Sequence, residues 1–181
     1  FMNRAHTAEE SKNCISLAMR YFDNITIDLI YGVPNMSSEK GLKNLQIAFE
    51  FEVPHISSYA LTVEEKTALH SLIKKGKVPP VDGNLALAHF NMLVEETQKQ
   101  GLIQYEISNF GKPNYFSKHN TSYWLGEKYV GIGPSAHSFN GFERSWNVSN
   151  NAKYIKALNE NNLPQDIEIL SLNDRFNEYV M

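Results

Sequence analysis

The regular alternation of helix-like and strand-like segments over the first 110 residues constrains the fold of this chain most. The segments with helical spacing of apolar residues are 8–22, 37–49 and 84–100, and the apolar or β-branched, strand-like segments are 25–31, 55–61 and 105–108. Strands that alternate with helices pair in parallel through right-handed crossovers. The sequence therefore predicts an α/β fold with three parallel strands.

Three strands are too few to close a barrel, so this region fits the second half of a (β/α) barrel of the TIM type. After Phe110 the pattern changes. Asn140-Gly141 predicts a hairpin with a type I′ turn, and Tyr154, Ile155 and Leu158 mark a further helix. We expect three parts: half of a barrel over 1–112, an extension over 113–147, and the start of a helical α+β domain over 148–181.

Both ends of the chain are expected to be cut. No strand precedes the first helix pattern, and the capped helix that begins at Ser171 stops on the apolar residues Val180 and Met181. The pattern predicts a piece of a longer protein.

Composition excludes several classes of function. The 181 residues carry a net charge of −3, which gives no electrostatic basis for binding nucleic acid. No apolar run approaches the roughly 20 residues of a membrane helix, and no secretory signal is recognisable, so a cytoplasmic location is expected. The single cysteine, Cys14, excludes an internal disulfide and cannot by itself hold an iron–sulfur cluster.

Asp28 is the strongest candidate for a ligand-binding residue, because α/β folds bind ligands at the carboxyl ends of their strands. It lies inside the apolar run Ile27-Asp28-Leu29, where an unpaired carboxylate is costly. Two interpretations remain open: a buried Asp that pairs with a helix cap or an Arg, or a carboxylate that faces the barrel interior and accepts hydroxyl or ammonium donors. Tyr59, on the next strand, is either core packing or an aromatic wall of the same cavity.

His119 is the second candidate. Tyr123 lies four residues later, on the same face of a helix, and Trp124 points about 100° away. Imidazole is a usual axial ligand of haem iron, but most single histidines cap a helix or bind a backbone carbonyl. The nearby Gly131-Ile132-Gly133-Pro134 lacks the third glycine of a phosphate loop and favours a tight turn that lets the backbone approach a ligand closely. His137, just after it, either faces a cavity or stabilises the turn.

Five ordered segments resemble one family, the oxygen-independent coproporphyrinogen III oxidase-like radical S-adenosylmethionine proteins. They are Asn3-Arg4-Ala5-His6-Thr7, Asp28-Leu29-Ile30-Tyr31-Gly32-Val33-Pro34, residues 55–64, His119-Asn120-Thr121-Ser122-Tyr123-Trp124, and residues 131–138. The His-Asn-x-x-Tyr-Trp string is similar to the haem-chaperone branch. The resemblance runs from about Arg4 to about Trp146 and returns at 171–181.

The resemblance implies roles for particular residues. Arg4 and Asp28 would contact S-adenosylmethionine, Tyr59 and Thr62 would lie beside its nucleoside, and His137 would belong to the same side. His119 would ligate haem iron, with Tyr123 and Trp124 against the haem. The family's Cys-x-x-x-Cys-x-x-Cys motif, which holds a 4Fe-4S cluster, is absent from this sequence. The chain alone is therefore expected not to cleave S-adenosylmethionine.

The function implied is haem binding and transfer to acceptor proteins. One alternative is oxidative decarboxylation of coproporphyrinogen III in porphyrin biosynthesis, and another is a structural or interaction domain without catalysis. Exposed strand edges suggest either a homodimer or an unstable chain.

Overall fold

The computed structural model describes residues 5–180 and divides into two compact units. The break falls between Phe116 and Ser117. We call residues 5–116 the sheet unit and residues 117–180 the hairpin unit, and each is described by itself. Arg4 lies outside the described residues. The finer division at 112/113 and 147/148 stays a prediction.

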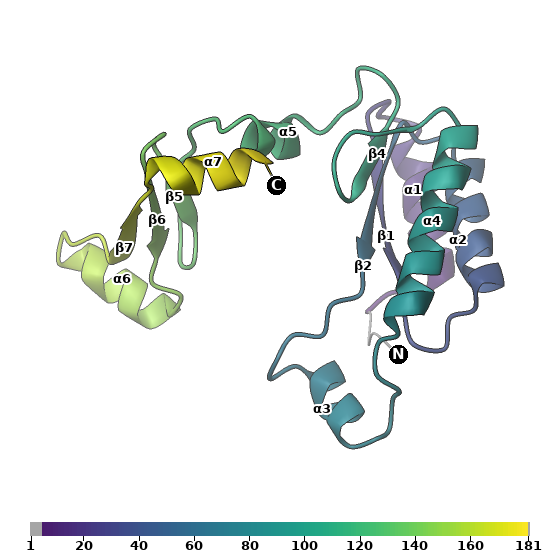
Figure 1. The fold of residues 1–181 in the computed structure, drawn as a ribbon, viewed down its shortest axis with the longest axis horizontal. Helices are drawn as coiled ribbons and strands as arrows, with labels where there is room; N and C mark the ends of the chain where they lie inside the picture. Colours follow the sequence, from purple (N-terminus) through teal and green to yellow (C-terminus); the bar gives the residue numbers. More distant parts are fainter. Residues whose placement is uncertain (1–4, 181) are drawn as a thin grey trace. The chain divides into compact units, whose positions relative to one another are not determined.

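A four-stranded mixed sheet forms the centre of the sheet unit, with strand order β1-β2-β4-β3 (Figure 1). The strands are β1 (Thr26–Tyr31), β2 (His55–Ala60), β3 (Ile103–Gln104) and β4 (Asn109–Gly111). β1 and β2 are parallel, with Thr26 opposite His55 and Tyr31 opposite Ala60. β4 is antiparallel to both β2 and β3. The mixed α/β content agrees with the sequence, and two of the three predicted strands are confirmed.

The third predicted strand, a parallel one over 105–108, is wrong. These residues form the turn that joins β3 to β4, and the Tyr105 amide donates to the Asn109 carbonyl at 3.3 Å. The Glu106 carboxylate accepts a hydrogen bond from the Ser108 amide at 2.9 Å. This local bond between side chain and backbone competes with a strand ladder. The chain therefore reverses at the turn, and β4 runs against β2.

Four helices belong to the sheet unit: α1 (Ala8–Ala18), α2 (Ser38–Glu50), α3 (Ala68–Lys74) and α4 (Gly83–Lys99). Their starts follow the sequence, because a side chain caps each one. Thr7 and Glu10 form a capping box, with the Thr7 amide donating to Glu10 at 2.7 Å. Asp82 accepts from the Asn84 amide at 2.8 Å at the start of α4. α1 ends at Ala18, before the predicted Phe22, and its Cys14 is exposed rather than buried.

The core lies between α2, α4 and one face of the sheet. Its buried members are Leu45, Ala48, Val53, Ile56, Leu93, Leu102 and Phe110. From β1, Ile27, Leu29 and Tyr31 pack against this cluster. Because side chains alternate along a strand, Asp28 and Ile30 belong to the opposite face of the sheet.

The hairpin unit has a three-stranded antiparallel sheet with order β5-β6-β7. Its elements are α5 (Lys118–Trp124), β5 (His137–Phe139), β6 (Glu143–Asn147), α6 (Asn151–Asn159), β7 (Gln165–Ile169) and α7 (Leu172–Val180). The predicted hairpin is confirmed, but its turn is not of type I′. Gly141 has a φ of 99°, whereas Asn140 has no positive φ and instead accepts from the Phe142 and Glu143 amides.

No helix within residues 5–180 has both the length and the apolar character needed to cross a membrane.

Candidate functional site

A polar row crosses the face of the four-stranded sheet that lies opposite the core. The register sets Asp28 beside Ser57, and Ser57 beside Asn109. Asp28 is exposed, whereas Ser57 and Asn109 are buried, at 5% and 2% exposure. The row therefore combines a solvated carboxylate with two desolvated polar groups on three neighbouring strands.

Of the two interpretations of Asp28, the buried and paired carboxylate is not what residues 5–180 show, because Asp28 is exposed there. β1 is the edge strand of the sheet, and Asp28 lies on the face that no core residue covers. Within residues 5–180 its carboxylate has neither a hydrogen bond nor an ion pair, so pairing with a helix cap or an Arg is not seen there. The carboxylate is available to accept donors from a ligand.

His55 holds the polar face together at the start of β2. Its Nδ1 lies 2.7 Å from Thr26 Oγ1, and its Nε2 lies 2.8 Å from the Tyr105 hydroxyl. The Tyr105 ring stacks on Phe116, with centroids 4.3 Å apart. Burial lowers the pKa of His55, although the carboxylates of Asp28 and Glu106 oppose that shift. A neutral imidazole donates with one nitrogen and accepts with the other, so two hydroxyl partners satisfy it completely.

Asn109 is the least satisfied member of the row. Its Oδ1 is buried and has no hydrogen-bond partner among the described residues. A buried, unpaired carbonyl oxygen is costly unless a ligand or water donates to it. The exposed Asp28 carboxylate is the acceptor that this face presents, which suits a ligand with ammonium, amide or hydroxyl donors.

Tyr59 and Thr62 lie toward the carboxyl end of β2. Tyr59 pairs with Ile30, so it shares the face of Asp28, and it is 42% exposed. This exposure argues against simple core packing and leaves its ring free to form a wall. Thr62 is also exposed, and its hydroxyl donates weakly to the Ala60 carbonyl at 3.4 Å. The structure thus brings Asp28 and Tyr59 to one face.

His119 lies on α5 in the hairpin unit, which begins where Ser117 accepts from the Asn120 amide. The His119 ring is exposed and meets Tyr123 edge-on, with centroids 5.0 Å apart. Tyr123 contacts Tyr129 in the same way at 4.8 Å, and Tyr129 lies 6.1 Å from Phe139. We call these four rings the aromatic ladder. Neither nitrogen of His119 has a hydrogen-bond partner in the part of the chain that is described.

A hollow of about 200 Å³ opens beside His119. It is lined by His119, Ser122, Tyr123, Glu127, Lys128 and Tyr129. Trp124 is 51% exposed and takes no part in the ring contacts between described residues. Tyr123 contacts His119, as the helical spacing predicts, and no ring contact joins Trp124 to His119 among the described residues.

The glycine segment packs on the hairpin. A Cβ at Gly131 would collide with the backbone of His137, and the Gly131 amide donates to Ser138 Oγ at 2.9 Å. The close approach seen here is to the backbone of the neighbouring strand, and the predicted approach to a ligand stays a prediction. His137 itself is exposed, with its ring 6.1 Å from that of Trp146.

Comparison with known proteins places these features in context. No protein-family model matches the sequence. The chain is 34% identical over 145 residues to the heme chaperone HemW of Bacillus subtilis, covering 79% of this chain and 38% of that protein. It is 38% identical over 139 residues to HemW of Buchnera aphidicola, covering 75% and 35%. It is 33% identical over 137 residues to a mitochondrial radical S-adenosyl methionine domain-containing protein 1 of mouse, covering 75% and 31%.

A solved structure shares the fold. The coproporphyrinogen III oxidase HemN of Escherichia coli, a radical SAM enzyme, superposes with a TM-score of 0.78 at 19% identity, over 98% of this chain and 44% of that one. The chain spans well under half the length of the curated relatives that it matches. The sequence matches confirm the resemblance: this chain is related to the haem-chaperone branch of the coproporphyrinogen III oxidase-like radical S-adenosylmethionine proteins.

Proposed function

We propose that this chain is the part of a radical S-adenosylmethionine haem chaperone that binds haem through His119 and contributes one face of the S-adenosylmethionine site. The observation that carries the proposal is the exposed His119 imidazole at the end of the aromatic ladder, whose two nitrogens have no hydrogen-bond partner within residues 5–180. It occurs in a chain that is 33–38% identical to proteins named heme chaperones.

The residues at His119 fit haem better than a bare metal ion. Within residues 5–180, no group of three or more His, Cys, Asp or Glu side chains could hold a metal. Haem iron brings four porphyrin nitrogens of its own, so one imidazole is a sufficient protein ligand. Tyr123 and Tyr129 would support the apolar macrocycle, and the Lys128 ammonium in the same hollow would pair with a haem carboxylate.

The polar face of the sheet fits the donor-rich end of S-adenosylmethionine. Asp28 would accept from its ammonium or ribose hydroxyls, and Tyr59 would flank the nucleoside. Arg4 and Thr62 would contribute to the same site. A 4Fe-4S cluster would need thiolates from outside this sequence, which has only Cys14. The sheet unit would then be the second half of a (β/α) barrel in a cytoplasmic protein.

A hemin titration of the chain, followed by Soret absorbance, tests the proposal. We expect saturation near one haem per chain, with a loss of at least tenfold in affinity for His119→Ala. His137→Ala is the matched control, because His137 is equally exposed in the same unit, and it should bind as the parent chain does. Equal loss in both variants, or none in either, would contradict ligation by His119.

Oxidative decarboxylation of coproporphyrinogen III is the second candidate, favoured by the HemN fold. This reaction requires the 4Fe-4S cluster, so turnover of coproporphyrinogen III would have to be measured in a full-length protein that carries the cluster. A folded chain that binds neither haem nor S-adenosylmethionine would instead favour the structural or interaction domain. Transfer to acceptor proteins and homodimer formation would be read from mixing and sizing experiments.

A further inference from the structure

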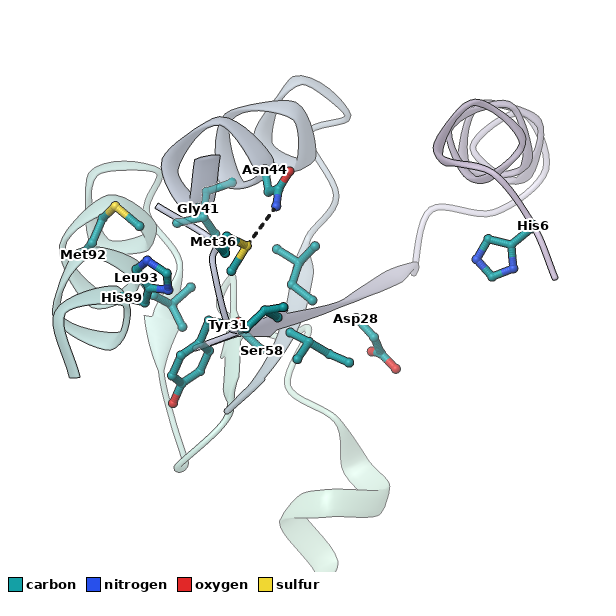
Figure 2. A pocket seen from close by; sticks show the side chains of 14 residues that line it. His6, Asp28, Tyr31, Met36, Gly41, Asn44, Ser58, His89, Met92 and Leu93 are labelled. Atoms are coloured by element: carbon teal, nitrogen blue, oxygen red, sulfur yellow. Dashed lines mark hydrogen bonds between the residues drawn. The ribbon is translucent and has the colours of Figure 1, made fainter. Parts of the chain in front are cut away.

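A cavity of about 550 Å³ beside β1, α2 and α4 belongs to the site proposed above, because Asp28 lines one end of it (Figure 2). At the other end the Gly32 amide donates to His89 Nδ1 at 3.2 Å, which leaves the proton of the neutral ring on Nε2. His89 is only 1% exposed, so its ring offers no group to a ligand in the cavity. The remaining candidate surface lies in the hairpin unit, along β7.

β7 has one side without a strand partner, because it lies at the edge of the order β5-β6-β7 (Figure 1). On its other side the Leu170 amide donates to the Phe142 carbonyl at 3.0 Å. Bonded pairs occur at every second residue of an antiparallel ladder, so Glu168 and Asp166 also face β6. The other three residues direct their N–H and C=O groups to the free side: Gln165, Ile167 and Ile169. No hydrogen bond between described residues satisfies these groups.

This edge lacks the usual features that prevent a further strand from pairing. All five residues of β7 are exposed, and neither Lys nor Pro interrupts them. The pairing with β6 runs from Gln165 to Ile169 without a bulge. Ile167 and Ile169 are 57% and 76% exposed. A free, regular and partly apolar edge of this kind is a template for an added strand.

The two faces of β7 differ in chemistry. Asp166 and Glu168 point to one face, and the two isoleucines point to the other. Glu168 lies opposite Arg144 on β6, but the Arg144 guanidinium is already paired with the Glu178 carboxylate at 3.0 Å. No ion pair between described residues uses Asp166 or Glu168. A strand added to this edge therefore meets carboxylates on one face and apolar side chains on the other.

A second copy of β7 does not fit this edge. Antiparallel pairing centred on Ile167 sets Asp166 of each copy opposite Glu168 of the other. A shift by two residues either way sets Asp166 opposite Asp166, or Glu168 opposite Glu168. Every register that keeps the isoleucines on one face and pairs at least three residues thus opposes two carboxylates, and like charges directly opposite each other destabilise a sheet.

We propose that the free edge of β7 binds an extended segment of another protein in which Lys or Arg alternates with apolar residues. The backbone of the segment pairs with Gln165, Ile167 and Ile169, and these main-chain hydrogen bonds provide the affinity. Its cations lie beside Asp166 and Glu168, which provides the specificity. The surface uses none of the residues assigned to haem or to S-adenosylmethionine, so it is independent of both proposals.

Three short peptides test the proposal against the full chain at low salt, by NMR titration of the backbone amides. The first has the core Val-Lys-Val-Lys-Val, the second has Glu in place of Lys, and the third is the lysine peptide with its three valine amides methylated. We expect the lysine peptide to bind about tenfold more tightly than the glutamate peptide, because two cross-strand pairs change from attraction to repulsion. It should also slow amide exchange at Ile167 and Ile169. The methylated peptide keeps the charge but cannot pair, so it should not bind.

Ile167→Pro tests the edge itself. Its missing N–H faces the free side, so the ladder to β6 is kept, and Pro is tolerated at such edge positions. We expect it to lose about tenfold in affinity for the lysine peptide, through the lost donor and the bulk of the ring. Ile167→Val is the matched control, because it keeps the N–H, and it should bind as the parent chain does. Trp146 fluorescence checks that the sheet of each variant is intact.

Three results would each overturn the proposal. The first is no binding of the lysine peptide to the parent chain. The second is equal binding of the lysine and glutamate peptides, which would mean that Asp166 and Glu168 select nothing. The third is equal binding of the lysine peptide and its methylated form, which would mean attraction between charges without strand pairing. This last comparison uses only the parent chain, so it does not depend on the folding of Ile167→Pro.

Discussion

Thr26→Val tests whether the hydrogen bonds of His55 stabilise the sheet unit. The substitution keeps the shape of the side chain and its preference for a strand, but it removes the hydroxyl that lies 2.7 Å from His55 Nδ1. His55 is only 4% exposed, so water replaces that partner poorly. Leaving a buried polar atom without its partner costs about 1–3 kcal/mol. We expect the free energy of unfolding to fall by about 1.5 kcal/mol, since the Tyr105 hydroxyl still satisfies Nε2.

Hydrogen exchange is the appropriate assay. Both tryptophans, Trp124 and Trp146, lie in the hairpin unit, so their fluorescence reports on that unit and not on the sheet. Amide protection of Ile56 and Phe110, the most buried strand residues, reports on the sheet unit. A loss of about 1.4 kcal/mol corresponds to roughly a tenfold fall in protection.

Thr62→Val is the matched control for Thr26→Val. Thr62 is exposed, and its hydroxyl makes only a long, 3.4 Å bond to the nearby Ala60 carbonyl. In Thr62→Val we expect the amide protection of Ile56 and Phe110 to change by less than about twofold, as for most surface substitutions. Equal, small effects of both variants would refute the reasoning, because His55 would then gain nothing from Thr26.

Two further predictions concern the same unit. Burial lowers the pKa of both His55 and His89 below the usual 6.5, so the unfolded chain binds more protons than the folded one once the pH falls through that value. The free energy of unfolding of the sheet unit should therefore be constant above about pH 7 and decline as the pH falls from about 6.5 toward the pKa values of the folded chain. Amide exchange between pH 7 and 5 measures this decline. A rise in stability on acidification would contradict the prediction. Phe110→Ala removes a side chain that is 0% exposed and lies opposite Ile56, and it should cost about 3–5 kcal/mol in urea unfolding followed by circular dichroism. A loss below about 1 kcal/mol would mean that β4 is not part of the core.

Local sequence signals were sufficient for the helix starts and for two of the strands. Thr7, Ser37 and Asp82 cap their helices as their residue types predict, since a short polar side chain reaches the free amides of the first turn. The prediction failed at 105–108, where an apolar run with a tyrosine looked like a strand. These residues instead form a turn that is closed by the hydrogen bond from the Ser108 amide to the Glu106 carboxylate, and this bond is known only from the folded structure.

The residues of the candidate site also fall into those that the sequence identified and those that only the structure revealed. Sequence pattern identified Asp28 and His119, and both are exposed and unpaired within the described residues. It did not identify His55, His89 or Asn109, because each acquires its character from residues distant in the sequence. His55 needs Thr26 and Tyr105, and His89 needs Gly32. Asn109 is notable only because, among the described residues, no donor reaches its side-chain Oδ1.

The sequence by itself determined the alternating elements, their caps and the family relationship, because capping and hydrophobic periodicity act over a few residues and motifs persist in the chain. The tertiary structure alone decided the direction of β4, the exposure of Asp28 and the tautomer of His89. Those properties depend on strand register and on hydrogen bonds between residues as much as 57 positions apart, as between Gly32 and His89, and no local pattern encodes which of these partners will meet.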